Sequence, residues 1–460
     1  MKLTKFMPRN FFTMLLIFLL IMGAQFSINI VNQTSVSGSA KIYIVEIFIF
    51  LFSFYVVFIN MIVKKQLKDS TFISKFIFFM MIVFIVFYIS TSVYRIVNGQ
   101  SLTGSLFLAR VIIETSLIFL CLDYFKIKSE LVLKSLFLIA LTSSIWQLVI
   151  LFLENGVIRG SIVLGNSNVY NTFIMMLIPP MIFTFGDKKY DWKWINCINI
   201  FLFIPISLLS GSRIGYMLMM FILFVSILIF LPKFSLAKKF LTILFFVILS
   251  MVIIITINLF GNQLSKNNIS RSISIPVSIV YKVIPKYTSE INHQEKKESE
   301  IDSKKINLKE SNKLSQSEYV AATAAKSNAY REEWNSLAKE SILKSPTNFF
   351  IGSGISIVHT SVSGYQTPHN FILQYMLPYG VIGTIICFIL LFSPLIMILK
   401  FHKLKIMLLY SIYFPLVITS INQPLLGNMI MCFTLFLLVY AVYYYDMKYM
   451  SKSRKDSCIG

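Results

Sequence analysis

Charged residues are scarce in this chain of 460 residues: Asp, Glu, Lys and Arg make up 13% of it, whereas 56% is hydrophobic. The mean hydropathy is +0.75. So few charges exclude a soluble globular domain and a disordered chain, and the balance is typical of a polytopic membrane protein. Among the charged residues the acidic ones are the scarcer, with 20 Asp and Glu against 42 Lys and Arg.

Cysteine is also rare. Four of the five cysteines lie in or beside apolar stretches, and the fifth lies in the C-terminal tail. This placement excludes a disulfide framework and a thiolate metal site. The chain also lacks a phosphate-binding loop followed by lysine, a His-Glu-x-x-His helix and a cluster of carboxylates. We therefore expect no metal and no cofactor, and we expect ATP-driven chemistry to reside elsewhere.

The chain is instead rich in long apolar runs, and a transmembrane helix needs ~20 such residues. Twelve stretches qualify, near residues 11–31, 42–63, 73–94, 102–122, 131–153, 162–185, 195–211, 214–231, 240–260, 370–399, 406–421 and 425–445. They predict an all-α, polytopic membrane helical bundle of about 12 transmembrane helices. Helix-breaking residues interrupt the tenth stretch at Pro378, Gly380, Gly383 and Pro394. They predict a kink or a break in that helix, which survives at membrane depth only where protein or a wet cavity covers the backbone.

The basic residues predict the orientation in the membrane. Counted by connection, 23 Lys and Arg lie in the two chain ends and in every second connection between the stretches. The alternate short connections carry only Lys41, Arg95, Arg159 and Arg213. This positive-inside pattern predicts a multi-pass protein with both termini cytoplasmic. Because the charge acts as an orientation signal and forms no basic face, we expect no nucleic-acid partner.

One connection is far longer than the others, with 108 residues from 261 to 368. It divides the chain into a nine-span bundle (1–260), a large extracytoplasmic loop, and three C-terminal spans with a cytoplasmic tail (369–460). Residues 287–328 are rich in Lys, Glu, Ser and Asn and poor in aromatics, which predicts a mobile segment. Residues 321–344 have apolar side chains at helical spacing. They predict an amphipathic helix, whose apolar face lies on the membrane surface or against the bundle.

Ionisable side chains inside spans are costly and usually functional. The clearest are Glu46, Arg110 and Glu114. Arg110 and Glu114 are four residues apart on one helix face, so they can pair. Two interpretations remain open: a structural ion pair inside the bundle, and a part of a substrate site.

A stronger pattern combines Arg213 at a short outward turn, Arg331 on the predicted amphipathic helix, and His369. Taken singly, they suit a snorkelling arginine, a surface charge and an incidental histidine. Thr367 as N-cap and Pro368 after it would place His369 in the first turn of the next span. Taken together on the outer side, two guanidiniums can hold a diphosphate by bidentate hydrogen bonds. A neutral imidazole at the positive end of a helix can serve as general base.

Four segments carry recognisable polar motifs. They are Gly165-Asn166-Ser167-Asn168; Ser212-Arg213-Ile214-Gly215; Arg331 to Trp334 followed by Gly352-Ser353-Gly354; and His369-Asn370 followed by Gly380-Val381-Ile382-Gly383. Over residues 160–385 these motifs resemble those of the O-antigen ligase and polymerase superfamily of bacterial membrane glycosyltransferases. Two positions depart from the family pattern: Trp334 comes one residue early, and Pro378-Tyr379 replaces a glutamate often found before the Gly-x-x-Gly.

The resemblance implies a GT-C-like fold in the bacterial plasma membrane, and metal-independent glycosyl transfer at its outer face. Donor and acceptor would be oligosaccharides on undecaprenyl diphosphate, and partners would include a chain-length regulator and a flippase. By motif position, Arg213 and Arg331 would hold the diphosphate and His369 would activate the acceptor hydroxyl. The substrate-binding residues that the resemblance implies are Asn370, Asn166, Asn168 and Ser212. We add Arg110 and Glu114 as candidates because they are ionisable residues inside a predicted span.

Three functions remain in competition. The first is a polysaccharide polymerase that joins lipid-linked repeat units into capsule, exopolysaccharide or O-antigen. The second is a ligase that moves finished chains to lipid A core or another acceptor. The third, of a different class, is a flippase for lipid-linked oligosaccharide. Flippases lack a long outward loop that ends in His-Asn at the start of a span, so this loop favours a glycosyltransferase.

Deletion within residues 290–318 should leave activity intact if that stretch is only a mobile connection. The measurement is activity and membrane insertion of the deleted protein. Complete loss of activity with normal insertion would show that the stretch has a role of its own.

Overall fold

The computed structural model describes most of the helical bundle and part of the long loop. The described residues are Ile17, 27–29, 41–43, Leu51, 71–99, 103–153, 167–185, 187, 190–210, 212–231, 234–260, 269, 316–355, 358–360, 364–366, 368–400, 403–421, 425 and 428–445. The predicted spans near 11–31 and 42–63 and the predicted mobile segment lie largely outside them. Within the described residues the chain is all-α apart from two short strand pairs.

Ten helices correspond one by one to the remaining predicted stretches. They are α3 (Phe72–Val97), α4 (Thr103–Tyr124), α5 (Ser129–Leu153), α6 (Ser167–Phe185), α7 (Lys193–Leu209), α8 (Arg213–Phe230), α9 (Leu236–Phe260), α14 (Phe371–Met397), α15 (Lys403–Ser420) and α16 (Met429–Tyr444). A 3-10 turn, η6 (Ile398–Lys400), follows α14. Six of these helices are long and apolar enough to cross a membrane, and α7, α8 and α16 contain shorter apolar helices. The chain is therefore a multi-pass helical membrane protein, as predicted.

The two strand pairs depart from the all-α prediction. Strand β1 (Ser27–Asn29) pairs antiparallel with β2 (Lys41–Tyr43). Strand β3 (Val358–Thr360) pairs antiparallel with β4 (Gly364–Gln366) inside the long loop. Residues 27–29, near the predicted end of the first span, and residues 42–43, near the predicted start of the second, are therefore strand residues. The alternation Ser27-Ile28-Asn29 has the period of two that a strand requires, and it ends the apolar run.

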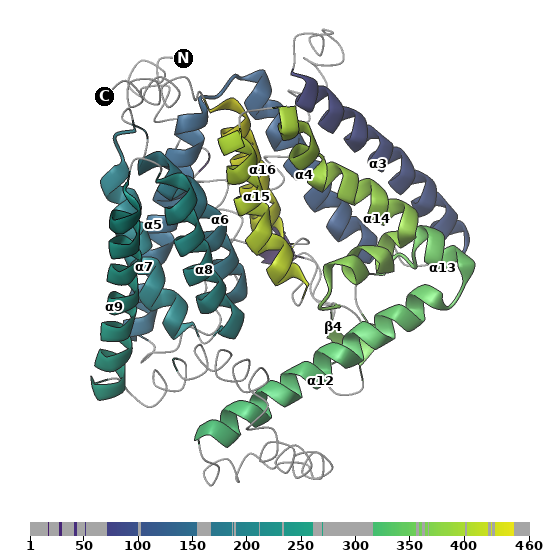
Figure 1. Cartoon of the computed structure of the whole chain (residues 1–460). Coiled ribbons are helices and arrows are strands. Elements are labelled where there is room, and N and C mark those ends of the chain that lie inside the picture. The colour runs from purple at the N-terminus through teal and green to yellow at the C-terminus, as the bar shows by residue number, and fades with distance from the viewer. Residues whose placement is uncertain are drawn as a thin grey trace.

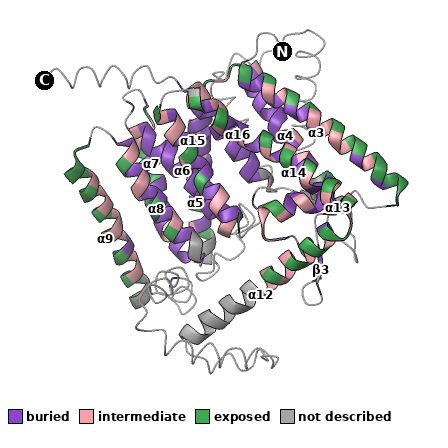
Figure 2. Cartoon of the chain, turned by 45° about the vertical axis from the view of Figure 1, so that its right-hand side comes forward, coloured by how far each residue is buried: buried purple, intermediate pink, exposed green. Residues whose placement is uncertain are grey.

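The distribution of apolar side chains fits a bilayer. Helices α6 and α16 are buried along nearly their whole described length, and they form the centre of the bundle. Helix α9 instead exposes large apolar side chains on the outside of the bundle (Figure 2). In water such a surface would favour association. In a membrane it faces hydrocarbon, so no partner is needed to cover it.

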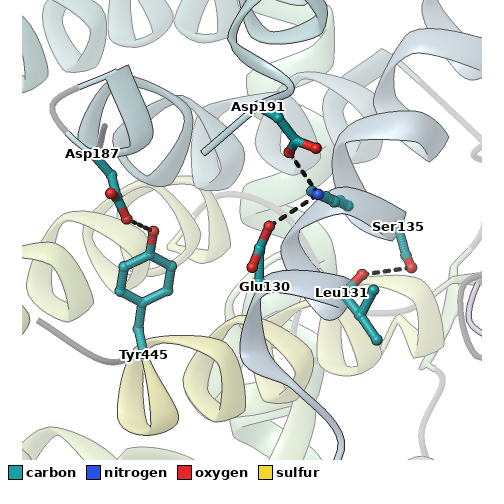
Figure 3. A network of polar contacts seen from close by, with 7 residues as sticks. Glu130, Leu131, Ser135, Asp187, Asp191 and Tyr445 are labelled. Carbon is teal, nitrogen blue, oxygen red and sulfur yellow. Dashed lines mark hydrogen bonds and ion pairs between the residues drawn. The ribbon is translucent and has the colours of Figure 1, made fainter. Parts of the chain in front are cut away.

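One end of the bundle gathers the lysine-rich connections α4–α5, α6–α7, α8–α9 and α14–α15, and we call it the lysine-rich end (Figure 1). Polar contacts link the helices there. Lys134 Nζ lies 2.9 Å from Glu130 Oε1 and 2.6 Å from Asp191 Oδ1, and Tyr445 donates a hydrogen bond to Asp187 (Figure 3). The hydrogen bond from Lys134 lowers the pKa of the Asp191 carboxyl. We call the opposite end of the bundle the site end.

The described part of the long loop lies at the site end. Helix α12 (Gln316–Leu343) lies obliquely across that end, and the short helix α13 (Pro346–Ile351) follows it (Figures 1 and 2). Helix α12 begins five residues before the predicted amphipathic segment. Pro346 is the first residue of α13, and Ser345 caps it by accepting a hydrogen bond from the Asn348 N–H at 3.1 Å.

Candidate functional site

His369 lies at the start of α14, directly before the residue that caps the helix. Asn370 has an extended backbone (φ −142°, ψ 126°), and its Oδ1 accepts hydrogen bonds from the N–H groups of Ile372 and Leu373, at 2.9 and 3.3 Å. The prediction that Thr367 caps the helix, with His369 in the first turn, is therefore wrong. The asparagine carboxamide satisfies two N–H groups of the first turn, and asparagine is a stronger N-cap than threonine.

The imidazole of His369 packs against α12. The ring centroids of Trp334 and His369 lie 4.6 Å apart, and Tyr330 stacks on Trp334 at 6.3 Å. Arg331 lies three residues before Trp334, so the two side chains are neighbours on the same face of α12. Arg331 is half-buried, and this burial lowers the pKa of its guanidinium. Helix α12 thus carries an arginine and an aromatic pair to the start of α14.

A small separate core holds α12 against the first half of α14. Its buried members come from α12, β3 and α14, namely Ala338, Ile342, Val358 and Leu377. Burial of a Leu or Ile side chain contributes about 1.5–3 kcal/mol. Of the two predicted places for the apolar face of α12, the structure has the one against the bundle.

The predicted break in α14 is confirmed, and it lies at Gly380. Gly380 has φ 63° and ψ −168°, and Gly352, directly after α13, has φ 81° and ψ 165°. Both conformations are essentially restricted to glycine. A Cβ on Gly352 would lie 2.4 Å from the backbone of Pro378 and Tyr379, and a Cβ on Gly380 would lie 2.5 Å from the nitrogen of Gly352. The Gly-x-Gly and Gly-x-x-Gly motifs therefore meet in one backbone contact, which we call the glycine crossing.

Neighbouring groups bind the backbone that the break leaves without helical partners. The N–H and hydroxyl of Ser353 donate to the carbonyl of Leu377, at 2.8 and 2.9 Å. The N–H of Ser105 donates to the carbonyl of Gly354 at 3.0 Å, and the hydroxyl of Tyr379 donates to the carbonyl of Ser105 at 2.5 Å. These bonds tie the glycine crossing to the start of α4.

Arg95 also binds the glycine crossing, and the sequence reasoning missed it. It was assigned to a short outward connection, but it lies in the last turn of α3 with no exposed surface. Its Nη2 donates to the carbonyls of Ile351 and Pro378, at 2.5 Å each. A sequence signal existed, because Arg95 directly follows an apolar run with no acidic residue near it.

A second polar group joins the starts of α6 and α8. Ser212 caps α8 by accepting a hydrogen bond from the Gly215 N–H at 3.1 Å, and its hydroxyl donates to Oδ1 of Asn168 at 2.9 Å. Asn171 donates to the hydroxyl of Ser210 at 2.9 Å, and its amide lies where a Cβ on Gly215 would clash. The Gly-x-x-Asn and Ser-Arg-x-Gly motifs therefore contact each other. Arg213 is the first residue of α8, and its side chain lies outside the described residues.

Both groups lie at the site end of the bundle. Thr172 of α6 donates to the hydroxyl of Thr419 at 3.2 Å, so the start of α6 meets the end of α15. Because α14 is followed by α15 through a connection at the lysine-rich end, the start of α14 lies at the site end as well. Helix α12, with Arg331, lies across that end (Figure 1). The starts of α8 and α14 and helix α12 therefore share one end of the protein.

The remaining candidates have other outcomes. Arg110 is half-buried and Glu114 is buried in α4, at 2% exposure, one turn apart. Their pairing and their contact with substrate stay predictions. Asn166 and Glu46 lie outside the described residues.

A family model described as O-antigen ligase matches residues 198–388. The matched segment begins inside α7 and ends inside α14, so it contains Ser212, Arg213, Arg331 and His369 but not Asn168. No curated protein and no solved structure matches the chain.

Gly352→Ala or Gly380→Ala should destabilise the protein strongly. Each adds a backbone conformation that costs about 1–3 kcal/mol for a residue with a Cβ, and each places that Cβ within 2.5 Å of the facing backbone. Gly99→Ala is the matched control, since Gly99 also has a positive φ of 67° but nothing lies within 4 Å of its Cβ position. The measurement is the midpoint of thermal unfolding in detergent. Equal shifts in all three variants would contradict the crossing.

Proposed function

We propose that this chain, which a family model described as O-antigen ligase matches over residues 198–388, is a membrane glycosyl-transfer enzyme and, more closely, a bacterial polysaccharide polymerase. It transfers a glycan from undecaprenyl diphosphate to the acceptor sugar of another lipid-linked repeat unit. The reaction takes place at the outer face of the plasma membrane, with both termini of the chain in the cytoplasm. No metal takes part.

One observation carries the assignment of the site: the packing of Trp334 on His369 at 4.6 Å. This contact sets the histidine of α14 beside the helical turn that carries Arg331. The start of α8, with Arg213, lies at the same end of the bundle. Two guanidiniums and an imidazole in one region suit a substrate that combines a diphosphate with a hydroxyl nucleophile.

The proposed reaction is a single displacement. The uncharged imidazole of His369 takes the proton of the acceptor hydroxyl as its oxygen attacks the anomeric carbon of the donor. The bond between that carbon and the diphosphate oxygen breaks, and undecaprenyl diphosphate leaves. Arg213 and Arg331 hold the diphosphate and stabilise the negative charge that develops on the leaving oxygen. Cleavage of the bond between the sugar and the lipid diphosphate supplies the free energy for glycosyl transfer, so no nucleotide is needed.

The polar cluster around Ser212 would support Arg213. Two hydrogen bonds fix the first turn of α8, of which Arg213 is the first residue: the Ser212 hydroxyl donates to Asn168, and the Gly215 N–H donates to Ser212. Residues on rigid elements hold catalytic groups more precisely than loop residues do. Asn166 and Asn370 are proposed to help orient the substrate, and Arg110 and Glu114 of α4 to line its approach.

The most direct test of the activity uses purified protein in detergent with lipid-linked repeat unit. The substrate is extracted from cells in which the gene for this chain is deleted. We expect a ladder of polymer without added nucleotide and in the presence of EDTA. The family description favours one alternative, a ligase, which would leave the repeat unit unpolymerised but transfer finished glycan to lipid A core or another acceptor. Movement of the intact lipid-linked glycan across the vesicle membrane, without any transfer of glycan, would indicate a flippase.

His369→Ala should lower the rate of transfer at least a hundredfold, because general base catalysis contributes about 10²–10⁴-fold. The measurement is the initial rate of ladder formation, with membrane insertion followed in parallel. Tyr445→Phe, at the lysine-rich end, is the control and should keep the wild-type rate. Normal polymer from the His369 variant would remove the base assignment.

Arg213→Lys should be severely impaired although the charge is kept. An ammonium cannot form the two parallel hydrogen bonds of a guanidinium, and the loss of one bond to a charged group costs about 1.5–3 kcal/mol. The same rate assay applies, with the affinity for undecaprenyl diphosphate measured as a competitor. Near-normal rate and affinity would indicate that Arg213 only snorkels to the membrane surface.

A further inference from the structure

Arg95 is a buried cation whose side-chain hydrogen bonds, among the described residues, all go to the backbone at the glycine crossing. We call the glycine crossing, together with the carbonyls of Ile351 and Pro378, the joint. No part of its side chain is exposed, and its Nη2 donates to the carbonyls of Ile351 and Pro378 at 2.5 Å each. Within the described residues, its Nε and Nη1 are buried without a hydrogen-bond partner. An arginine placed in this way is costly to bury. The hydrogen bonds to the two carbonyls offset part of this cost.

Both carbonyls are backbone groups that lack a helical partner. In an unbroken helix, the carbonyl of Pro378 would accept from the N–H of Ile382, but the non-helical backbone of Gly380 lies between them. The carbonyl of Ile351 belongs to the last residue of α13. A single nitrogen of Arg95 thus joins the end of one helix to the break in another, on the α3 side of the glycine crossing.

This joint sets the position of a larger unit. Helix α12, α13 and the first half of α14 pack together through the core of Ala338, Ile342, Val358 and Leu377. That unit carries Arg331 and His369. Arg95 binds it from α3, and Ser105 of α4 binds the same joint, so these contacts hold the unit against the bundle that carries Arg213.

We propose that Arg95 is a positioning residue for glycosyl transfer. It does not touch the substrate. It acts through the carbonyls of Pro378 and Ile351 on the direction of the first half of α14 and on α12. It thereby sets His369 and Arg331 relative to Arg213. This inference rests on the proposed function for its link to catalysis, while the joint itself is a structural claim with a separate measurement.

The kinetic test compares Arg95→Met with Arg95→Lys. The methionine variant removes the donors, and we expect a single-turnover rate about a hundredfold lower, since misplacement by about 1 Å has such an effect. The KM for the lipid-linked repeat unit should stay within about threefold of the wild type. The lysine variant, which keeps a charged donor on a shorter side chain, should lie between the two. An unchanged rate in the methionine variant would overturn the proposal, and so would a loss confined to KM, which would indicate direct contact with the donor.

Lys405→Met is the matched control. Lys405 is also a buried cation that donates to a backbone carbonyl, that of Tyr443 at 2.9 Å, but at the lysine-rich end. Its removal should lower thermal stability and leave the single-turnover rate within about twofold. A rate loss equal to that of the Arg95 variant would mean that general destabilisation explains both, and would overturn the proposal.

A distance measurement separates positioning from activity. Spin labels at the exposed residues Glu340 of α12 and Met217 of α8 report how the two elements sit. Arg95→Met should shift or broaden the distance distribution, whereas Lys405→Met and Arg331→Lys should not. An unchanged distribution overturns the inference. A shift in the Arg95 variant alongside wild-type protein that makes no glycan product would sustain the positioning role and reject the proposed function.

A milder variant covers the case in which both Arg95 variants fail to insert. Ser353→Ala removes the hydroxyl bond to the Leu377 carbonyl but keeps the backbone bond to the same oxygen. We expect a rate about threefold lower with unchanged KM. A wild-type rate in this variant would overturn the idea that the joint sets the catalytic geometry.

Discussion

A backbone carbonyl buried inside a protein has no water to bind, and this constraint governs the joint between α13 and α14, where Leu377, Pro378 and Gly380 are buried. Gly380 breaks α14, so the carbonyls of Leu377 and Pro378 lose their helical partners. Ser353 and Arg95 replace them. The close approach that makes this replacement possible requires Gly352 to face Gly380 without a Cβ on either. The break at Gly380, the turn at Gly352 and the hydrogen bonds of Arg95 therefore depend on one another.

The two ends of the bundle have different roles. At the lysine-rich end, an ion pair joins Lys134 of α5 to Asp191, and a hydrogen bond joins Tyr445 to Asp187, so both tie other elements to the connection between α6 and α7 (Figure 3). At the site end, polar contacts instead fix helix starts: Asn370 caps α14 and Ser212 caps α8. Side chains carried on rigid helix starts are held more precisely than side chains on loops.

Hydropathy and helix-breaking residues predicted the ten described bundle helices and the break in α14, because span length and proline or glycine act locally. The motifs predicted a resemblance to the family whose model matches residues 198–388. The contact of Trp334 with His369 was not predicted. The cap of α14 was predicted wrongly: Thr367 and Asn370 both form caps, and the Pro368 that follows Thr367 outweighed the stronger preference of asparagine for the N-cap position. The sequence marks Arg95 as a cation next to an apolar run, but its partners could not be predicted, because Ile351 and Pro378 lie 256 and 283 residues away. The meeting of Gly352 with Gly380 could not be predicted either, because it depends on how α13 folds back on α14.

The central claim is that Arg213, Arg331 and His369 surround one diphosphate at the site end. An experimental structure with bound undecaprenyl diphosphate tests it most directly. The account predicts both guanidiniums within hydrogen-bond distance of the phosphates, and the imidazole on the side of the glycan-bearing oxygen. A diphosphate bound at the lysine-rich end, or one that touches neither arginine, would contradict it.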